Sequence, residues 1–425
     1  MTLNSEYSPV IVSLLDTDLY KLTMQAVVFD HFRDANVSYA FKNRSPEKKL
    51  NKKAVEWLQF QINSLKNLRY SSDEIEFLQS QVPFFHKDFI DYLRKFKVDP
   101  EHQVSLSYDE IEQEINIAIE GPWIETIIYE IPILALVSEA YFKFVDTQWS
   151  YDEQFELASH KCEQLIAAGC PFSEFGTRRR RSYLTQDTVI KGIIAAAKNS
   201  PNSALFTGTS NVHFARNYGL KPTGTVAHEW MMGVAASTND YLNANRLAME
   251  LWLKTVGNSN AGVALTDTFG TDAFLKDFIP PFSDIYAGVR QDSGDPEEYT
   301  EKIGQHYRKL GYPAGSKLII YSDSLNIERC IQYKAVAERN GLRAAFGVGT
   351  FFTNDFYNIS DNSIKSTPMN IVIKLSSLNG KPAIKISDNL GKNMGDPETV
   401  FRVKKELGYI DRSWKDGDEL HRWDK

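Results

Sequence analysis

The side chains best suited to chemistry are one histidine and three aspartates, His228, Asp267, Asp292 and Asp323, each just after a short apolar run. An imidazole can act as a base or a nucleophile, and either role needs a carboxylate that fixes its tautomer and stabilises its cationic form. Glu229, Asp267 and Asp292 are the candidates for that carboxylate. The alternative is a packed histidine bonded to a neighbouring carboxylate. No second histidine shares these motifs, so we expect no histidine–zinc site and no dedicated metal site.

A run of four arginines lies in the segment FGTRRRRS, residues 175–182. One or two arginines could hold a phosphate or carboxylate, and Arg178, nearest the preceding strand, is our choice. The alternative is a solvated helix start with salt bridges, or a nuclear localisation signal. Phe175 could belong to the core or form a platform for a flat ring. Arg290 and Ser210 also follow apolar runs and complete the polar set.

The segment GVGT, Gly347 to Thr350, follows the last such run. Barrel proteins often hold phosphate on backbone N–H groups in the loops after strands seven and eight. A simple turn is the alternative for so short a motif. Its position favours a phosphate-binding loop in which Gly347, Gly349 and Thr350 take part.

Seven apolar runs between residues 170 and 350 must position these side chains. Successive runs end 34, 19, 39, 25, 31 and 24 residues apart, which is enough for a strand, a loop and a helix each time. The pattern predicts an irregular (β/α) barrel over residues 165–355, with a doubly wound open sheet as the alternative. In a barrel the carboxyl ends of the strands meet at one rim, where active sites lie.

The flanking segments have a different pattern. Alternation at residues 37–41, 104–108 and 115–119 predicts half-buried antiparallel strands, and IVIKLSSLNGKPAIKIS predicts a hairpin that turns at Asn379-Gly380. Helices are predicted from an apolar stripe at residues 54–65, from a capping box at Ser71 and Glu74, and from about 152 to Gly169. We therefore expect a discontinuous mixed α+β domain, residues 1–150 plus 365–425, beside the barrel.

Composition narrows the class of protein. The chain has 425 residues, 42% of them hydrophobic, and a net charge of −7, so a large core is possible and a general binder of nucleic acid or acidic membranes is not expected. No apolar stretch approaches a membrane span, and no secretory signal is visible. The three cysteines, Cys162, Cys170 and Cys330, form neither a disulfide framework nor a zinc motif. We expect a cytoplasmic protein, with the nucleus as an alternative.

Nine motifs in sequence order together resemble the nicotinate phosphoribosyltransferases of the eukaryotic and enterobacterial type. They run from residue 16 to about 397 and are DTDLYKLTM, EFGTRRRRS, GTSN, GTVAHEW, LTDTFGTD, VRQDSGDP, YSDSLN, FGVGT and KISDNLGK. The resemblance implies an irregular α/β barrel with a second domain. It also implies transfer of phosphoribosyl from 5-phosphoribosyl-1-pyrophosphate to nicotinate, with ATP hydrolysis coupled through a phosphohistidine. Mg²⁺ is expected to bind mostly through substrate phosphates.

The resemblance also assigns roles. His228 matches the phosphorylated histidine, with Asp267 and Asp292 as acidic positions around it. Phe175 would stack on one face of the pyridine, and Tyr20 of the partner subunit in a homodimer would cover the other. Further positions match the substrate pocket or the phosphates: Arg178, Arg290, Asp323, Gly349, Arg44 and Lys374.

Ser210 bears on the choice of substrate. Relatives that use nicotinamide carry an aspartate there, which accepts from an amide but repels a carboxylate, whereas serine can donate to a carboxylate. Nicotinate is therefore expected as substrate and nicotinamide is the alternative. Two rival hypotheses are a basic-patch binding protein acting through Arg178–Arg181 and a quinolinate-type decarboxylating transferase.

Overall fold

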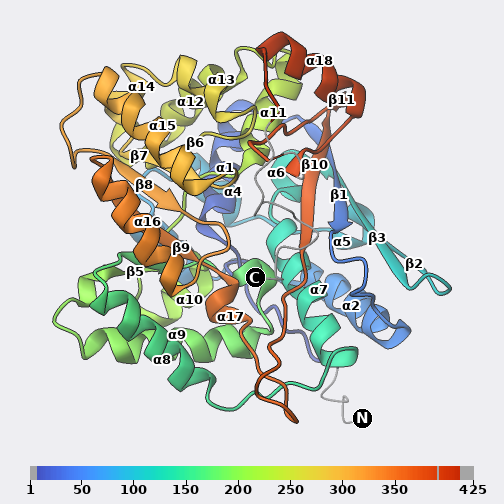
Figure 1. Ribbon diagram of the computed structural model, residues 1–425. Helices are drawn as coiled ribbons and strands as arrows, with labels where there is room; N and C mark the ends of the chain where they lie inside the picture. The colour runs from blue at the N-terminus through green and yellow to red at the C-terminus, as the bar shows by residue number, and fades with distance from the viewer. Residues whose placement is uncertain (1–6, 390–391, 412–425) are drawn as a thin grey trace.

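The computed structural model describes residues 7–389 and 392–411, and it builds them into two sheets with helices between and around them (Figure 1). One sheet has six parallel strands and the other has five strands that pair antiparallel. This confirms the expected mixed α/β class with a separate antiparallel sheet. The division into two domains at the expected boundaries stays a prediction, which limited proteolysis would test.

The parallel sheet has the strand order β5-β4-β9-β8-β7-β6. Its strands are β4 (Phe172–Glu174), β5 (Phe206–Thr209), β6 (Val263–Leu265), β7 (Gly288–Gln291), β8 (Leu318–Tyr321) and β9 (Arg343–Val348). The first strand, β4, pairs with both β5 and the last strand, β9, so the order runs around as in a barrel. Within the described residues, β5 and β6 do not pair, and the ring is open there.

The third of the seven expected strands, PTGTVAHE, is the reason for this opening. Apart from a single bridge between Thr209 and Pro222, residues 220–227 are coil that runs to the start of α11 (His228–Thr238). The prediction of a strand was wrong because the β-branched residues of this segment bind other parts of the site instead of a neighbouring strand, as described below. Helices α11 and α12 (Ala244–Val256) then fill the interval before β6.

Helices follow the other parallel strands. They are α9 (Tyr183–Lys198), α10 (Val212–Tyr218), α13 (Thr271–Asp277), α14 (Phe282–Ile285), α15 (Pro296–Lys309), α16 (Ile327–Arg339) and the short α17 (Thr350–Thr353). Helix α8 (Gln154–Ala167) precedes β4 and packs against α9 and α16. It ends at Gly169, whose φ of +66° is the left-handed conformation predicted for a residue just past a helix.

The antiparallel sheet joins the two ends of the chain. Its order is β11-β10-β1-β3-β2, with β1 (Asn36–Asn43), β2 (Val104–Asp109), β3 (Glu114–Pro122), β10 (Ile371–Leu378) and β11 (Lys381–Pro382). The predicted hairpin between β10 and β11 is confirmed, because Asn379 and Gly380 both have positive φ, 49° and 76°. The pairing of β1 with β10 therefore brings a late segment beside an early one.

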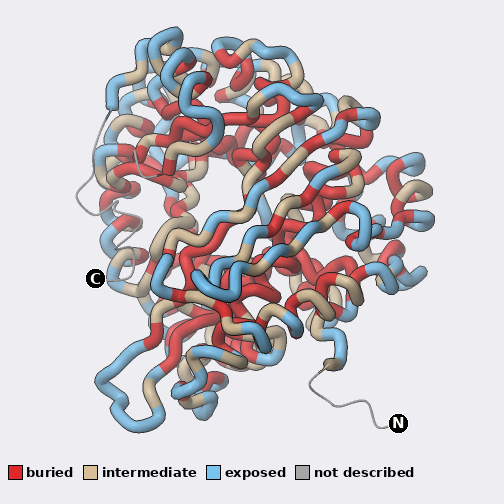
Figure 2. The backbone as a smooth tube through the Cα atoms, turned by 90° about the vertical axis from the view of Figure 1, so that its right-hand side faces the viewer, coloured by how far each residue is buried: buried red, intermediate tan, exposed pale blue. Residues whose placement is uncertain are grey.

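Buried helices join this sheet to the parallel one. Helices α1 (Leu19–His31) and α7 (Glu130–Phe144) are buried over most of their length, and α7 and α11 pack on β10. Buried residues fill the interior of the molecule, and exposed residues lie mostly along its outside (Figure 2). The remaining helices are α2 (Lys52–Ser64), α3 (Ser72–Gln81), α4 (Lys87–Leu93), α5 (Pro100–Gln103), α6 (Trp123–Thr126) and α18 (Pro397–Leu407). The capping box at Ser71 and Glu74 begins α3 as predicted. Among the described residues, no helix has the length and hydropathy that crossing a bilayer requires.

Candidate active site

A cavity of about 160 Å³ lies where the carboxyl ends of the parallel strands face the antiparallel sheet. Both sheets and the buried helices between them contribute to its wall. It brings together twelve of the predicted site residues: Tyr20, Arg44, Phe175, Arg178, Ser210, His228, Arg290, Asp292, Asp323, Gly347, Gly349 and Lys374. Their positions in the chain span more than 350 residues, so only the folded chain makes them neighbours.

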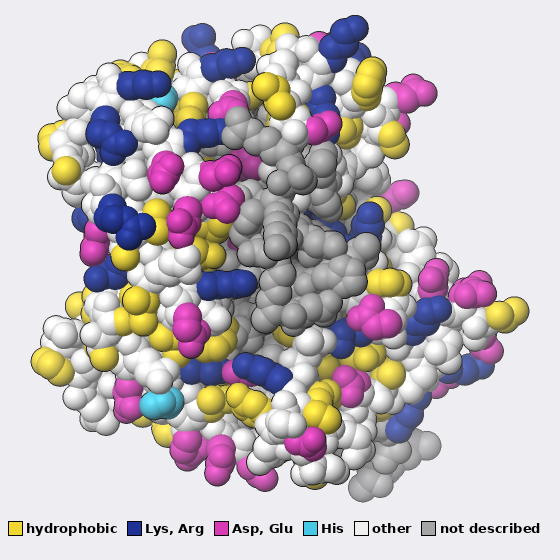
Figure 3. Space-filling view, viewed as in Figure 1, with side chains coloured by type: hydrophobic (Ala, Val, Ile, Leu, Met, Phe, Trp, Pro, Cys, Tyr) yellow, Lys and Arg dark blue, Asp and Glu magenta, His cyan; other side chains and the backbone are white. Residues whose placement is uncertain are grey.

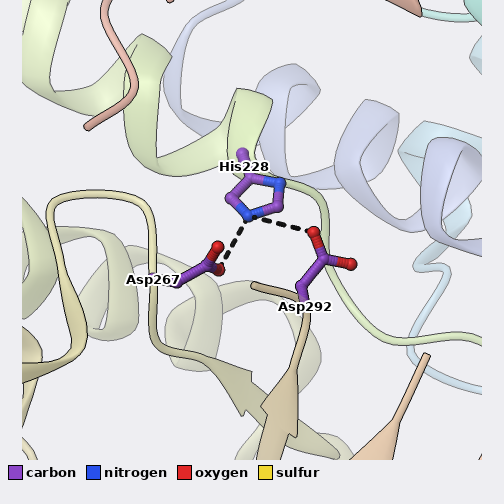
Figure 4. A group of neighbouring side chains, drawn as sticks. All are labelled: His228, Asp267 and Asp292. Atoms are coloured by element: carbon purple, nitrogen blue, oxygen red, sulfur yellow. Dashed lines mark hydrogen bonds and ion pairs between the residues drawn. The ribbon is translucent and has the colours of Figure 1, made fainter. Parts of the chain in front are cut away.

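His228 lies at the first position of α11, and its Nε2 faces two carboxylates (Figure 4). Its Nε2 lies 2.8 Å from Oδ1 of Asp267 and 3.6 Å from Oδ2 of Asp292. Asp267 follows β6 and Asp292 follows β7, so the two carboxylates come from neighbouring strand ends. A carboxylate can only accept, so Nε2 carries the ring proton, and Nδ1 lies on the opposite side of the ring (Figure 4).

Burial controls the charge of this cluster. Burial lowers the pKa of His228 to about 4. The nearby Lys385 ammonium lowers this pKa further, whereas the Asp267 carboxylate raises it. Lys385 and His228 instead hold the pKa of Asp267 below its usual range, although burial opposes them. At neutral pH the imidazole is therefore neutral and nucleophilic, and its Asp267 partner is ionised.

Two further side chains, Ser293 and Lys385, hold the carboxylate oxygen of Asp267 that does not bond His228. The Ser293 hydroxyl donates to its Oδ2 at 2.5 Å, and Lys385 Nζ lies 3.4 Å from the same oxygen. The ligand atoms of His228, Asp267 and Asp292 lie within 4.8 Å of one another. Two carboxylates suit a hard divalent cation, but Lys385 already supplies a positive charge to both of them.

Arg290 explains why the expected strand before His228 is a coil. Its guanidinium donates to Thr225 Oγ1 at 2.9 Å and to the Val226 carbonyl at 3.2 Å. The same side chain donates to Ser322 and to Asp292. The half-buried Arg290 of β7 thus holds residues 225–226 across the open side of the sheet, and it sets where α11 and His228 begin.

The arginine run forms a short 3₁₀ turn at residues 177–179 and then an extended stretch; helix α9 begins only at Tyr183. Arg178 and Arg179 line the cavity. Arg180 is fully buried and forms a bidentate pair with Asp16, at 2.8 and 2.7 Å. Arg181 is 1% exposed and packs on the rings of Phe142 and Phe356. The alternative of a solvated helix start is therefore wrong, because Arg179, Arg180 and Arg181 are all buried; the alternative of a localisation signal is not tested by the fold.

Phe175 and Tyr20 both line the cavity. The Phe175 ring lies directly over Gly347, where a Cβ would be 2.4 Å from the ring. Gly347 is thus needed for the close approach of an aromatic side chain, in addition to any part in a phosphate loop. Gly349 lines the cavity beside it.

Tyr20 belongs to the same chain as the cavity that it lines. Residues 15–19 pair with residues 210–213 through backbone hydrogen bonds, including Leu19 N–H to the Ser210 carbonyl at 2.8 Å. Gly224 lets the coil before His228 pass close to the Tyr20 backbone. The chain's own Tyr20 therefore lies at this cavity, and the expectation that Tyr20 of the partner subunit covers the pyridine stays a prediction.

Ser210 does not face the cavity with a free hydroxyl. Its Oγ donates to Asp18 Oδ1 at 2.7 Å, and Asp18 also lines the cavity. An aspartate is therefore present in this pocket, but it comes from the first motif and not from GTSN. The argument that serine makes the pocket receptive to a carboxylate is incomplete without Asp18.

Three predicted residues lie outside the cavity wall. Asp267 acts on His228 from behind the ring. Glu229 does not orient His228: its carboxylate accepts from Tyr39 and Trp123 and pairs with Lys21, all buried. Successive residues of a helix point about 100° apart, which is why Glu229 faces away. Thr350 faces a different hollow, together with Asn326 and Lys365.

Several cavity residues were missed by sequence reasoning. They are Asp18, Glu130, Arg179, Lys385 and Lys392. Asp18, Arg179, Lys385 and Lys392 lie inside motifs quoted above, so the motifs carried a signal that the choice of single residues did not use. Glu130 lies in an apolar helical stretch, and only its pairing with Lys21 and its 4.0 Å approach to Arg178 and Lys374 reveal its place.

The cavity is rich in positive charge although the chain is acidic. Seven lysines and arginines line it against four acidic side chains. Burial lowers the pKa of Lys374 to about 7, whereas Lys392 pairs with Asp323 at 2.7 Å. On the face drawn in Figure 3, by contrast, basic and acidic side chains are interspersed. The concentration of cations inside a cavity suits a ligand with several phosphates.

Comparison with known proteins agrees with this geometry. Residues 170–410 match the nicotinate phosphoribosyltransferase (NAPRTase) family, and residues 15–138 match its N-terminal domain. A nicotinate phosphoribosyltransferase from Saccharomyces cerevisiae is 55% identical over 98% of this chain and 99% of its own. One from Escherichia coli strain SMS-3-5 / SECEC is 38% identical over 93% of this chain and 95% of its own.

A solved structure shares the fold. The crystal structure of a Saccharomyces cerevisiae protein described as a putative nicotinate phosphoribosyltransferase superposes with a TM-score of 0.93 at 54% identity. It covers 95% of this chain and 99% of that chain. A Porphyromonas gingivalis nicotinate phosphoribosyltransferase superposes with a TM-score of 0.86 at 33% identity, over 94% of this chain and all of its own.

Proposed function

The chain belongs to the nicotinate phosphoribosyltransferase family, and we propose that it transfers phosphoribosyl from 5-phosphoribosyl-1-pyrophosphate to nicotinate. The products are nicotinate mononucleotide and pyrophosphate, a step of NAD biosynthesis. The observation that carries the proposal is the cavity itself, where a neutral imidazole held by two carboxylates adjoins a concentration of cations. ATP hydrolysis is coupled to the transfer.

The cavity can hold both substrates. Phe175 and Tyr20 offer aromatic surfaces for the pyridine, and the cationic residues Arg44, Lys374 and Lys392 are placed for the phosphates. The pyridine nitrogen attacks the ribose C1 while the bond between C1 and the pyrophosphate oxygen breaks. The positive charge that develops on the sugar is favoured by nearby carboxylates, and Asp292 and Asp323 line this wall. Gly347, Gly349 and Thr350 are proposed as the phosphate loop, with Thr350 contributing only backbone.

We propose His228 as the phosphorylated residue. Because Nε2 is occupied by Asp267, Nδ1 is the nucleophile. Nδ1 attacks the terminal phosphorus of ATP, and ADP leaves; water later cleaves the N–P bond and releases phosphate. Asp267 stabilises the ring while it carries positive charge, and Asp292 lies beside it. The added phosphate brings acceptor oxygens, so that the closed site binds 5-phosphoribosyl-1-pyrophosphate more tightly.

Mg²⁺ is a proposed cofactor. It would be held mostly by substrate phosphates and water, with Asp292 as the carboxylate of this chain closest to that position and Asp267 behind it. When bound, it neutralises phosphate charge. The side chains Arg290 and Lys385 supply fixed positive charge at the same wall, whether or not the ion is present.

Assembly and location are finer proposals. A homodimer with shared sites stays a prediction; in the single chain, Tyr20 lines the chain's own cavity. Size-exclusion chromatography with light scattering would test the dimer. A cytoplasmic location, with the nucleus as the alternative, stays a prediction for imaging of a tagged chain.

One assay tests the function. The purified chain is incubated with nicotinate and 5-phosphoribosyl-1-pyrophosphate, with and without Mg·ATP, and the mononucleotide is measured. We expect product in both cases and faster turnover with ATP. Product from nicotinamide but not from nicotinate would favour the nicotinamide alternative. Release of CO₂ from quinolinate would favour the decarboxylating one.

A further inference from the structure

Asp18 is a buried acid with no place in the mechanism above. It is 5% exposed, yet it lines the cavity beside Tyr20, one of the two proposed ring platforms. Its position is fixed on both sides. A β-bridge joins Asp18 to Asn211, and the Leu19 N–H donates to the Ser210 carbonyl. Ser210 N–H in turn donates to the Glu174 carbonyl, directly before Phe175.

These links put Asp18 close to Tyr20 and Ser210 close to Phe175 in the cavity wall, at one edge of the pyridine slot that we propose between the two aromatic rings. A pyridine held in that slot directs its ring substituent toward the polar edge, because the faces of the slot are apolar. The substituent of nicotinate is a carboxylate. A negative substrate group would therefore meet an aspartate, which is favourable only if one of the two carboxyl groups carries a proton.

We propose that Asp18, as a carboxylic acid, and Ser210 together donate hydrogen bonds to the carboxylate of nicotinate, so that binding of nicotinate is linked to a proton on Asp18. This inference rests on the proposed function. In the empty cavity Ser210 Oγ donates to Asp18 Oδ1. With nicotinate bound, the Ser210 hydroxyl and the Asp18 O–H both turn to the substrate. When Asp18 is ionised, it repels nicotinate and can instead accept from the N–H of nicotinamide.

The charged groups around Asp18 leave it able to hold this proton. Burial raises the pKa of Asp18 to about 6, while the hydrogen bond from Ser210 and the charge of Arg178 work in the opposite direction. A bond from Thr177 also lowers it, and the charge of Glu130 raises it. Arg178 is one-third exposed and lies 4.0 Å from Glu130, which offsets its charge.

Other acids on neighbouring elements strengthen the effect. Glu174 of β4 is fully buried, and burial raises its pKa to about 7, with the Asp18 charge adding to the rise. The pKa of Tyr20 is raised by burial and by the charges of Glu130 and Asp18. Arg290 also lines the cavity and pairs with Asp292. Arg178 is thus the main cation that acts on Asp18, and the carboxyl groups of Glu130 and Glu174 lie near it.

The test compares the pH dependence of KM for nicotinate in the wild type and in Asp18→Asn at saturating phosphoribosyl pyrophosphate. Asparagine keeps the size and the acceptor for Ser210, and its NH₂ donates at every pH. The wild-type KM should rise about tenfold per pH unit above about pH 6, reaching about 100-fold at pH 8, while Asp18→Asn stays flat. Dividing the wild-type KM by the KM of Asp18→Asn at each pH cancels the effect of ionisation of the substrates themselves.

Two further variants separate recognition from general damage. Ser210→Ala removes a bond that lowers the pKa of Asp18, so the bend in the KM profile should move to higher pH. Asp388→Asn is the matched control: burial raises the pKa of Asp388 to about 6 as well, but its carboxylate accepts from Thr271, and it lines a different hollow. Its KM profile should match the wild type.

Measuring turnover of nicotinamide as well as nicotinate gives a second test. In the wild type the preference for nicotinate over nicotinamide should narrow as pH rises, because ionised Asp18 accepts from the amide. A flat wild-type KM profile for nicotinate, or one that survives unchanged in Asp18→Asn, overturns the inference while the transferase function stands. Failure to form nicotinate mononucleotide at any pH overturns the proposed function instead.

Discussion

Replacing Asp267 by asparagine separates the coupling reaction from the transfer. The variant keeps the shape of the side chain but removes the charge that faces His228 Nε2 at 2.8 Å. In the proposed mechanism this charge stabilises the imidazole ring only after Nδ1 has accepted a phosphoryl group. The substrate slot between Phe175 and Tyr20 does not include Asp267. ATP-stimulated turnover should therefore suffer far more than slow transfer without ATP.

The size of the loss follows from the geometry. At 2.8 Å and an effective dielectric constant of about 20, two unit charges attract by about 6 kcal/mol. Lys385, 3.4 Å from the other oxygen of Asp267, offsets part of that attraction. Breaking one side of a buried pair costs about 3–5 kcal/mol in measured cases. If this loss falls on the transition state for phosphorylation, the rate drops by about 10²–10⁴-fold.

The assay measures acid-labile phosphate on the protein after mixing with ATP labelled in its terminal phosphate, together with mononucleotide formation with and without ATP. We expect Asp267→Asn to lose labelling by the stated factor and to retain ATP-independent transfer within a few-fold. Asp388→Asn is the control, because the Asp388 carboxylate accepts from Thr271 in a different hollow and makes no hydrogen bond to His228 or Asp267 among the described residues. Labelling of Asp267→Asn at the wild-type rate would refute the assignment of His228 and its partner.

Three further predictions follow from single contacts. Glu229→Ala should lower the free energy of unfolding by about 3–5 kcal/mol in urea titrations, because buried donors on Tyr39 and Trp123 lose their acceptor; a loss below about 1 kcal/mol would contradict the structural role of Glu229. Gly347→Ala should raise KM for nicotinate about two- to tenfold by displacing the Phe175 ring, and an unchanged KM would argue against ring stacking there. Because the pKa of His228 is lowered to about 4, the neutral imidazole persists as pH falls, so labelling by ATP should change less than about twofold between pH 7.5 and 5.5; an ordinary histidine would lose about tenfold.

The site could be predicted only partly because sequence motifs name neighbours in the chain, not the direction of a side chain. His228 and Glu229 are adjacent and looked equally fit to act, but the turn of α11 sends one into the cavity and the other into the core. The arginine run likewise divides between cavity and interior, because Asp16 is placed to neutralise Arg180.

The open side of the parallel sheet is a second feature that the sequence pattern could not give. Residues 222–227 have the β-branched composition of a strand, and propensity alone predicts one. Arg290 binds the Thr225 side chain and the Val226 carbonyl, and this tertiary contact overrides the local preference. A single guanidinium can do so because each of its hydrogen bonds is strengthened by its charge.

What the sequence alone determined was the alternation of strand and helix, the turn at Asn379-Gly380, the end of α8 at Gly169, and a set of polar residues at strand ends. These depend on local φ and ψ preferences and on periodicity, which each short segment carries within itself. Only the tertiary structure decided that Tyr20 lies at the cavity of its own chain, that Asp18 joins Ser210, and that Lys385 lies beside Asp267. Those contacts join residues that lie more than 100 positions apart in the chain, and their geometry exists only after both sheets have packed around the buried helices between them.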